Sequence, residues 1–217
     1  GCASSGVSGE NAGVQDVIAW EDWRPEEPPI LQRTMNEAEK MQFRELDLEY
    51  QKENLLSQWG VEVDEFPPLV RWTDYSEGPR VWVECLIESG WAASYLEGGG
   101  VEAPKDLALE QQSAYLISQF DCYAKYSRDP NQAQPLSPSQ KGVLYDYMVE
   151  WWIPCVESQG YGFTMEIPPR EAYISSNDWD PWAYVTSPKK LRENSEEAQT
   201  LLIECPRIPP DAAMYPY

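Results

Sequence analysis

Val83-Glu84-Cys85-Leu86-Ile87-Glu88-Ser89-Gly90-Trp91 is a stretch that occurs a second time, weakly altered, in this chain of 217 residues. The second copy is Ile153-Pro154-Cys155-Val156-Glu157-Ser158-Gln159-Gly160-Tyr161. Both copies read cysteine, four residues, glycine and then an aromatic residue. Glycine readily adopts the left-handed backbone that ends a helix, so each copy predicts a helix that stops at its glycine and a strand that begins at the aromatic residue. The repeat therefore predicts two similar units of helix followed by strand.

A further cysteine follows each unit, Cys122 after the first and Cys205 after the second. None of these four cysteines forms a C-x-x-C pair, so they indicate two structural disulfides and not a redox or zinc motif. Pairing within each unit, Cys85 with Cys122 and Cys155 with Cys205, is the preferred of the three possible arrangements. Pairing across the units, Cys85 with Cys155 and Cys122 with Cys205, is nearly as well supported.

The sequence around the repeat predicts an α+β fold, a mainly helical single domain with a small antiparallel sheet or hairpins. Asn36 and Glu39 form a capping box at the start of one helix, and Ser137 with Gln140 forms another. Pro154 is expected to kink the helix that Ser137 begins. Helices are expected at about 37–58, 79–89, 107–126, 138–159, 170–175 and 195–204, and strands at 91–96, 101–103 and 161–167. The predicted divisions are a leader and tryptophan-containing arm at 1–33, a disulfide-linked domain at 34–205 and a proline-rich tail at 206–217.

The first residues, Gly1-Cys2 followed by the small residues 3–9, resemble a bacterial lipoprotein at the end of its signal peptide. Cys2 would carry the lipid, and the protein would then lie at the extracytoplasmic face of the plasma membrane. A processed lipoprotein begins with the cysteine itself, so Gly1 departs from that pattern. The chain has no apolar run of the roughly 18 residues that a spanning helix needs, so attachment would depend on the lipid.

Two tryptophans, Trp20 and Trp23, stand in the extended arm that follows the leader. Tryptophan side chains seldom stay in water, so they are expected to dock on their own domain or on a partner. Because tryptophan is over-represented among interface hot spots, both residues are candidate anchors for a protein partner.

Composition argues against several classes of function. The net charge of −21 disfavours nucleic acid and bare anionic membrane as partners. The chain contains no histidine, which removes the commonest general base and zinc ligand. The acidic loop at Asn177-Asp178-Trp179-Asp180 lacks the remaining ligands and the turn glycine of a calcium loop. No catalytic residue, metal or cofactor is therefore predicted, and a glycosidase built on carboxylate pairs is the least favoured reading.

Five motifs lie across residues 80–182: Cys85…Gly90-Trp91, Gln111 to Tyr126 with Cys122, Pro135-Leu136-Ser137, Leu144-Tyr145-Asp146-Tyr147 and Pro154-Cys155-Val156-Glu157…Gly160-Tyr161. Together they resemble an actinobacterial family of lipid-anchored exported proteins of unassigned function. The resemblance implies an exported setting with a lipid anchor and no catalytic residue.

Two non-enzymatic functions remain. The first is a non-catalytic accessory or interaction subunit on the outer face of a membrane protein complex, or bound to another cell-envelope protein. The alternative is a ligand-binding lipoprotein with an aromatic pocket near Trp179 and Trp182, which would take a cell-envelope glycan or amphiphile.

Overall fold

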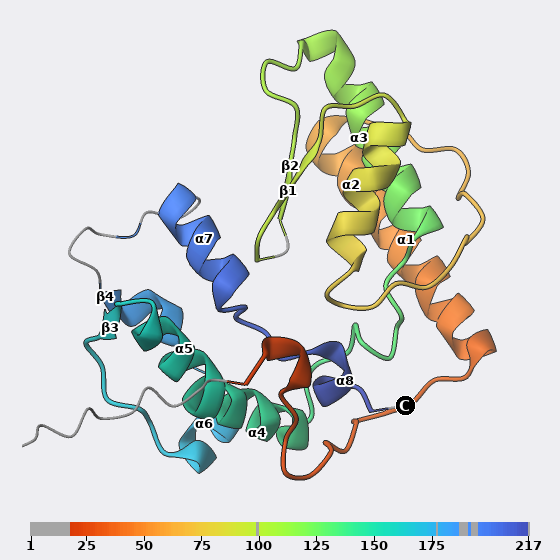
Figure 1. Cartoon of the computed structure of the whole chain (residues 1–217). Coiled ribbons are helices and arrows are strands. Elements are labelled where there is room, and N and C mark those ends of the chain that lie inside the picture. Colours follow the sequence, from red (N-terminus) through yellow and green to blue (C-terminus); the bar gives the residue numbers. More distant parts are fainter. Residues whose placement is uncertain (1–17, 99, 177, 187–190, 192–194, 217) are drawn as a thin grey trace, which may run out of the picture.

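Helices form most of the structure, a computed structural model that describes residues 18–98, 100–176, 178–186, 191 and 195–216. They are arranged in two lobes (Figure 1). The first lobe contains α1 (Glu37–Trp59), α2 (Gly78–Glu88), α3 (Leu109–Lys125) and a hairpin of β1 (Ser94–Leu96) and β2 (Gly100–Glu102). The second lobe contains α4 (Pro138–Tyr147), α5 (Ile153–Ser158), α6 (Arg170–Ser176), α7 (Glu196–Glu204), α8 (Asp211–Met214) and the antiparallel pair β3 (Gly162–Phe163) and β4 (Val185–Thr186). The mainly helical α+β class is thus confirmed.

The predicted repeat has the same backbone geometry in both copies. Gly90 and Gly160 have φ angles of 90° and 84°, in the left-handed region that glycine adopts without strain. The amide of Trp91 donates to the Leu86 carbonyl oxygen at 3.0 Å. The amide of Tyr161 makes the equivalent bond across its own helix end, at 3.3 Å. Both helices therefore end in a Schellman motif, which directs the chain into a strand.

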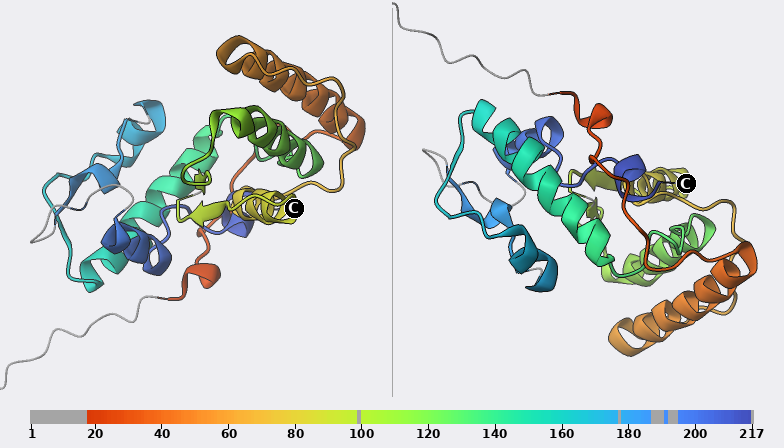
Figure 2. Two further views of the ribbon diagram at one scale, coloured as in Figure 1. Left: turned by 90° about the horizontal axis from the view of Figure 1, so that it is seen from above. Right: turned by 90° about the horizontal axis from the view of Figure 1, so that it is seen from below.

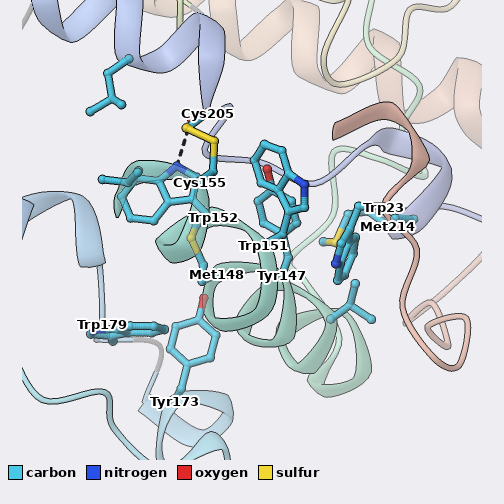
Figure 3. Packing of buried hydrophobic residues seen from close by; sticks show 14 of the residues in the cluster. Trp23, Tyr147, Met148, Trp151, Trp152, Cys155, Tyr173, Trp179, Cys205 and Met214 are labelled. Atoms are coloured by element: carbon cyan, nitrogen blue, oxygen red, sulfur yellow. Dashed lines mark hydrogen bonds between the residues drawn. A yellow bond between two sulfur atoms is a disulfide. The ribbon is translucent and has the colours of Figure 1, made fainter. Parts of the chain in front are cut away.

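Each disulfide lies within one lobe. Cys85 on α2 is bonded to Cys122 on α3, and Cys155 on α5 is bonded to Cys205 at the end of α7. This is the preferred pairing from the sequence, and the pairing across units does not occur. In the second lobe the indole of Trp152 lies beside the disulfide and donates from Nε1 to the Cys205 carbonyl oxygen at 3.0 Å (Figure 3). Two disulfides fit a protein of an oxidising compartment.

The arm and the tail are parts of the second lobe's core, not appendages of a domain limited to 34–205. Trp23 is only 4% exposed, and its ring meets the edge of Tyr147 at 5.0 Å between centroids. Met214 of the tail belongs to the same buried cluster, where Figure 3 shows it beside Trp23. Its carbonyl oxygen accepts a hydrogen bond from Gln140 Nε2 at 3.1 Å. The folded domain therefore includes the described parts of both terminal segments.

The helix that Ser137 caps changes its winding before Pro154. Residues Met148–Trp152 form a π-helical turn between α4 and α5. Proline has no amide hydrogen to donate, so a wider turn there accommodates the interrupted ladder. The expected irregularity is present, but as a change of winding one turn before the proline. The strands expected at 91–96 and 161–167 are shorter, at three and two residues. β2 has the three residues expected, shifted by one, and β4 was not predicted.

The first lobe is anchored by two cations on the buried face of α1. Arg44 donates from Nη2 to the Ala124 carbonyl oxygen at 2.7 Å, and Lys40 lies 2.6 Å from Asp129. Desolvation opposes the charge on Lys40, but hydrogen bonds to Asp129 and Glu37 outweigh it and raise the pKa of its amine. The rest of α1 lies at the edge of the molecule (Figure 2). No helix in the described residues is both long and apolar enough to cross a membrane.

Candidate functional site

A cleft of about 850 Å³ lies between the two lobes, within the usual size range of small-molecule sites. The first lobe contributes side chains from the start of α2, from the segment before it and from the first hairpin. The second lobe contributes side chains from α4, α6, the loop after α6 and the chain that leads to α8. Its lining residues include Tyr75, Arg80, Tyr95, Arg128, Leu144, Met148, Tyr173, Trp179 and Arg207.

Non-covalent contacts hold the two lobes together around the cleft. The amide of Glu97 in the first hairpin donates to Gln199 Oε1 on α7 at 2.7 Å. On α8, Asp211 Oδ2 accepts from the amide of Ser76 at 3.1 Å and also from its hydroxyl group. Burial is the main reason that the pKa of the Asp211 carboxyl group is raised, since the bonds from Ser76 act in the opposite direction.

Aromatic side chains of both lobes border this cleft, those of the second lobe with less than a tenth of their area exposed. Tyr75 and Tyr95 come from the first lobe, and Tyr173 and Trp179 come from the second. Trp179 packs edge-on against Tyr173 at 5.9 Å between ring centroids, and Figure 3 shows these two rings with Met148. Desolvation raises the pKa of the Tyr173 hydroxyl group, which therefore stays neutral at physiological pH.

Two arginines of the cleft are each paired with a carboxylate. Arg80 lies 2.7 Å from Glu97, and its guanidinium carbon is 4.1 Å from the centre of the Tyr95 ring. Arg207 contacts both carboxylate oxygens of Asp180, at 2.7 and 2.8 Å. These pairs hold planar polar groups beside aromatic rings, an arrangement that suits a ligand with a flat ring and polar substituents.

The two tryptophans of the predicted aromatic pocket lie in different places. Trp179 lines the cleft, but Trp182 does not. The Trp182 ring instead packs on Trp152 at 6.2 Å between centroids, near the Cys155–Cys205 disulfide. The short 3₁₀ turn over Pro181–Tyr184 points it to that side, because Asp180 caps the turn at the Trp182 amide.

The two tryptophans of the arm, both predicted to anchor a partner, differ in burial. Trp23 is buried in its own domain, so the structure contradicts its assignment as an exposed contact for a partner. Trp20 is partly exposed and donates from Nε1 to the Ile208 carbonyl oxygen at 2.8 Å, at the edge of the cleft. The two tryptophans dock on their own domain because Tyr147 and the tail supply a complementary apolar surface. Cys2, the predicted lipidation site, lies outside the described residues.

No known relative was found. Neither a protein-family model, nor a curated protein, nor a solved structure matches this chain. The described residues contain no group of three or more histidine, cysteine, aspartate or glutamate side chains that could hold a metal ion. What the cleft offers chemically is aromatic area, paired charges and hydrogen-bonding groups, which together can bind a ligand.

Proposed function

We propose that this is a non-catalytic binding protein that acts outside the cytoplasm and takes a ring-bearing cell-envelope glycan or amphiphile in the cleft between its lobes. The observation that carries the proposal is the cleft of about 850 Å³ with aromatic side chains on both walls. Packing of an aromatic ligand ring against such side chains contributes about 0.5–1.5 kcal/mol for each good contact beyond the area that it buries. Paired arginines at the rim would orient the polar substituents of the ligand.

The proposed location rests on the two disulfides and the N-terminal cysteine. Disulfides persist in exported proteins and are rare in the cytosol. A lipid on Cys2 would hold the protein at the outer face of the plasma membrane, where envelope glycans and amphiphiles are found. A role in binding also agrees with the lack of histidine, since the usual acid–base group of an enzyme is missing from the chain.

A cleft-filling variant tests the proposal. Leu144 is half-buried and lines the cleft, so Leu144→Trp would occupy part of the binding volume. Leu56→Trp on α1 is the matched control, because Leu56 is 51% exposed and lies away from the cleft. The probes are a tetramer of N-acetylglucosamine, followed by calorimetry, and the neutral amphiphile N-phenyl-1-naphthylamine, followed by its fluorescence. We expect at least one probe to bind, and Leu144→Trp to weaken it about tenfold or more while Leu56→Trp leaves it unchanged. Failure of both probes to bind would reject the proposal.

A second candidate function is the accessory subunit of a membrane protein complex, and the outward side of α1 favours it. Leu46 and Tyr50 are 66% and 60% exposed there, and Trp59 at the end of the helix is 60% exposed, although large apolar side chains are usually covered. Single exposed apolar residues are common, so the support lies in their occurrence on one helix at the edge of the molecule (Figure 2).

The accessory function is tested by purification of the tagged full-length precursor from membranes of its own host in mild detergent. A stoichiometric partner that is lost in a Leu46→Glu, Tyr50→Glu variant would support it. Recovery of the protein alone would reject it.

A further inference from the structure

Arg128 is the third arginine of the cleft, and its backbone is fixed between the lobes. It follows α3 and forms a parallel β-bridge with Thr73. The amide of Thr73 donates to the Ser127 carbonyl oxygen at 3.0 Å, and the amide of Asp129 donates to the Thr73 carbonyl oxygen at 2.9 Å. These bonds fix the backbone from which the Arg128 side chain extends at the cleft wall.

The Arg128 guanidinium differs from those of Arg80 and Arg207. Its carbon lies 4.3 Å from the centre of the Tyr75 ring, which orients the group by a cation–π contact. Its Nε atom is buried and has no hydrogen-bond partner in the described residues. No carboxylate of the described chain comes within 4.0 Å of it, whereas the other two arginines each have one.

An unpaired guanidinium is costly and requires an explanation. A buried donor without a partner destabilises the fold, and more so if it is charged. The chain has 37 acidic residues against 16 basic ones, so carboxylates that could pair with Arg128 are abundant. Asp211 is close enough for Arg128 to lower its pKa slightly, but its Oδ2 atom already accepts two bonds from Ser76. The Asp211 Oδ1 atom is likewise buried and has no partner in the described residues, so no described carboxylate is bonded to the Arg128 Nε atom.

We propose that Arg128 binds the acidic group of the cleft's ligand, so that the ligand is a ring-bearing carboxylate, phosphate or sulfonate. This inference rests on the proposed function of the cleft and specifies its ligand class. Arginine suits the task because its planar fork donates two parallel hydrogen bonds to such a group and keeps its charge at any physiological pH. The acidic residues at the cleft favour a ligand with a single negative charge over a polyanion. Glu97 and Asp180 are balanced by Arg80 and Arg207, but Glu21 and Asp178 have no ion pair in the described residues.

The test uses two fluorescent probes that share one ring system. 8-Anilinonaphthalene-1-sulfonate carries one sulfonate, and N-phenyl-1-naphthylamine is its neutral counterpart. We expect the wild-type protein to bind the sulfonate about tenfold tighter than the neutral probe. Arg128→Gln should abolish this preference and leave the affinity for the neutral probe unchanged within about twofold. Arg33→Gln is the control, because it removes one positive charge from an exposed site outside the cleft.

The outcomes separate this inference from the proposed function. If neither the fluorescent probes nor the N-acetylglucosamine tetramer bind in a way that Leu144→Trp weakens, the cleft is not a ligand site and both fail. If only the tetramer binds in that way, the anion site alone is rejected. If the neutral probe binds there as tightly as the sulfonate, or if Arg128→Gln and Arg33→Gln have equal effects, only the anion site is rejected. Should Arg128→Gln not fold, competition on the wild-type protein still decides: benzenesulfonate should displace the anionic probe and benzenesulfonamide should not. Equal displacement by the two would overturn the inference.

Discussion

Replacement of Trp23 by alanine tests whether the N-terminal arm is part of the folded domain. The side chain is 4% exposed and packs edge-on against Tyr147 at 5.0 Å and 76°. Truncation of a buried tryptophan to alanine costs about 3–5 kcal/mol, since transfer energy is lost and a cavity remains. We expect the free energy of unfolding to fall by about 4 kcal/mol, and the arm from residue 18 onward to lose protection from hydrogen exchange.

Trp20→Ala is the matched control on the same arm. Trp20 is partly exposed; its ring packs against the same buried cluster, and its indole donates to the Ile208 carbonyl oxygen. Its removal should cost about 1–2 kcal/mol, clearly less than that of Trp23, because it buries less apolar area. The assay is urea unfolding without reductant, followed by far-ultraviolet circular dichroism. A Trp23→Ala loss below 1 kcal/mol, or equal losses for the two variants, would refute the docking and return Trp23 to the candidates for a partner contact.

Three further predictions concern stability. Replacement of both Cys155 and Cys205 by serine should lower the free energy of unfolding by about 4 kcal/mol, because their bond closes a loop with a sequence separation of 50 residues; an unchanged urea midpoint would contradict this. Lys40→Met and Asp129→Asn should each lower the free energy of unfolding by about 2–4 kcal/mol, since both side chains are more than four-fifths buried. The double variant should lose clearly less than the sum of the two, whereas additive losses would show that the pair is not coupled. Asp211→Asn should gain stability relative to the wild type as pH rises above 3.8, the ordinary pKa of the carboxyl group. The reason is that burial raises this pKa in the folded state, so ionisation opposes folding. A difference in the free energy of unfolding between variant and wild type that stays constant from pH 3.5 to 7 would contradict this.

Local features of the fold were predictable from the sequence because each depends on a few adjacent residues. The capping boxes at Asn36 and Ser137 and the left-handed exits at Gly90 and Gly160 occur where the residue types predict them. Strand lengths were not predictable, since a strand ends where its pairing partner ends. Only Gly162 and Phe163 of the longer segment expected to be extended have such a partner.

The candidate site was predictable only in part. The sequence indicated aromatic side chains near Trp179, but no sequence pattern links Tyr75, Arg128 and Arg207, which come from three separate segments and meet only in the folded chain. The burial of Trp23 likewise depends on the ring of Tyr147, which is distant in sequence. Side chains that meet across lobes are thus beyond any argument from local pattern.

The confinement of each disulfide to one lobe has a consequence for a nicked molecule. A protease that cuts once within residues 127–136 would leave no covalent bond between the two halves, because neither disulfide spans that segment. The fragments would separate on a denaturing gel even without reductant. In native buffer they would stay together, since the first fragment still carries Trp23 in the core of the second. The arm would therefore hold the two fragments together by non-covalent packing, while each disulfide links residues of one fragment only.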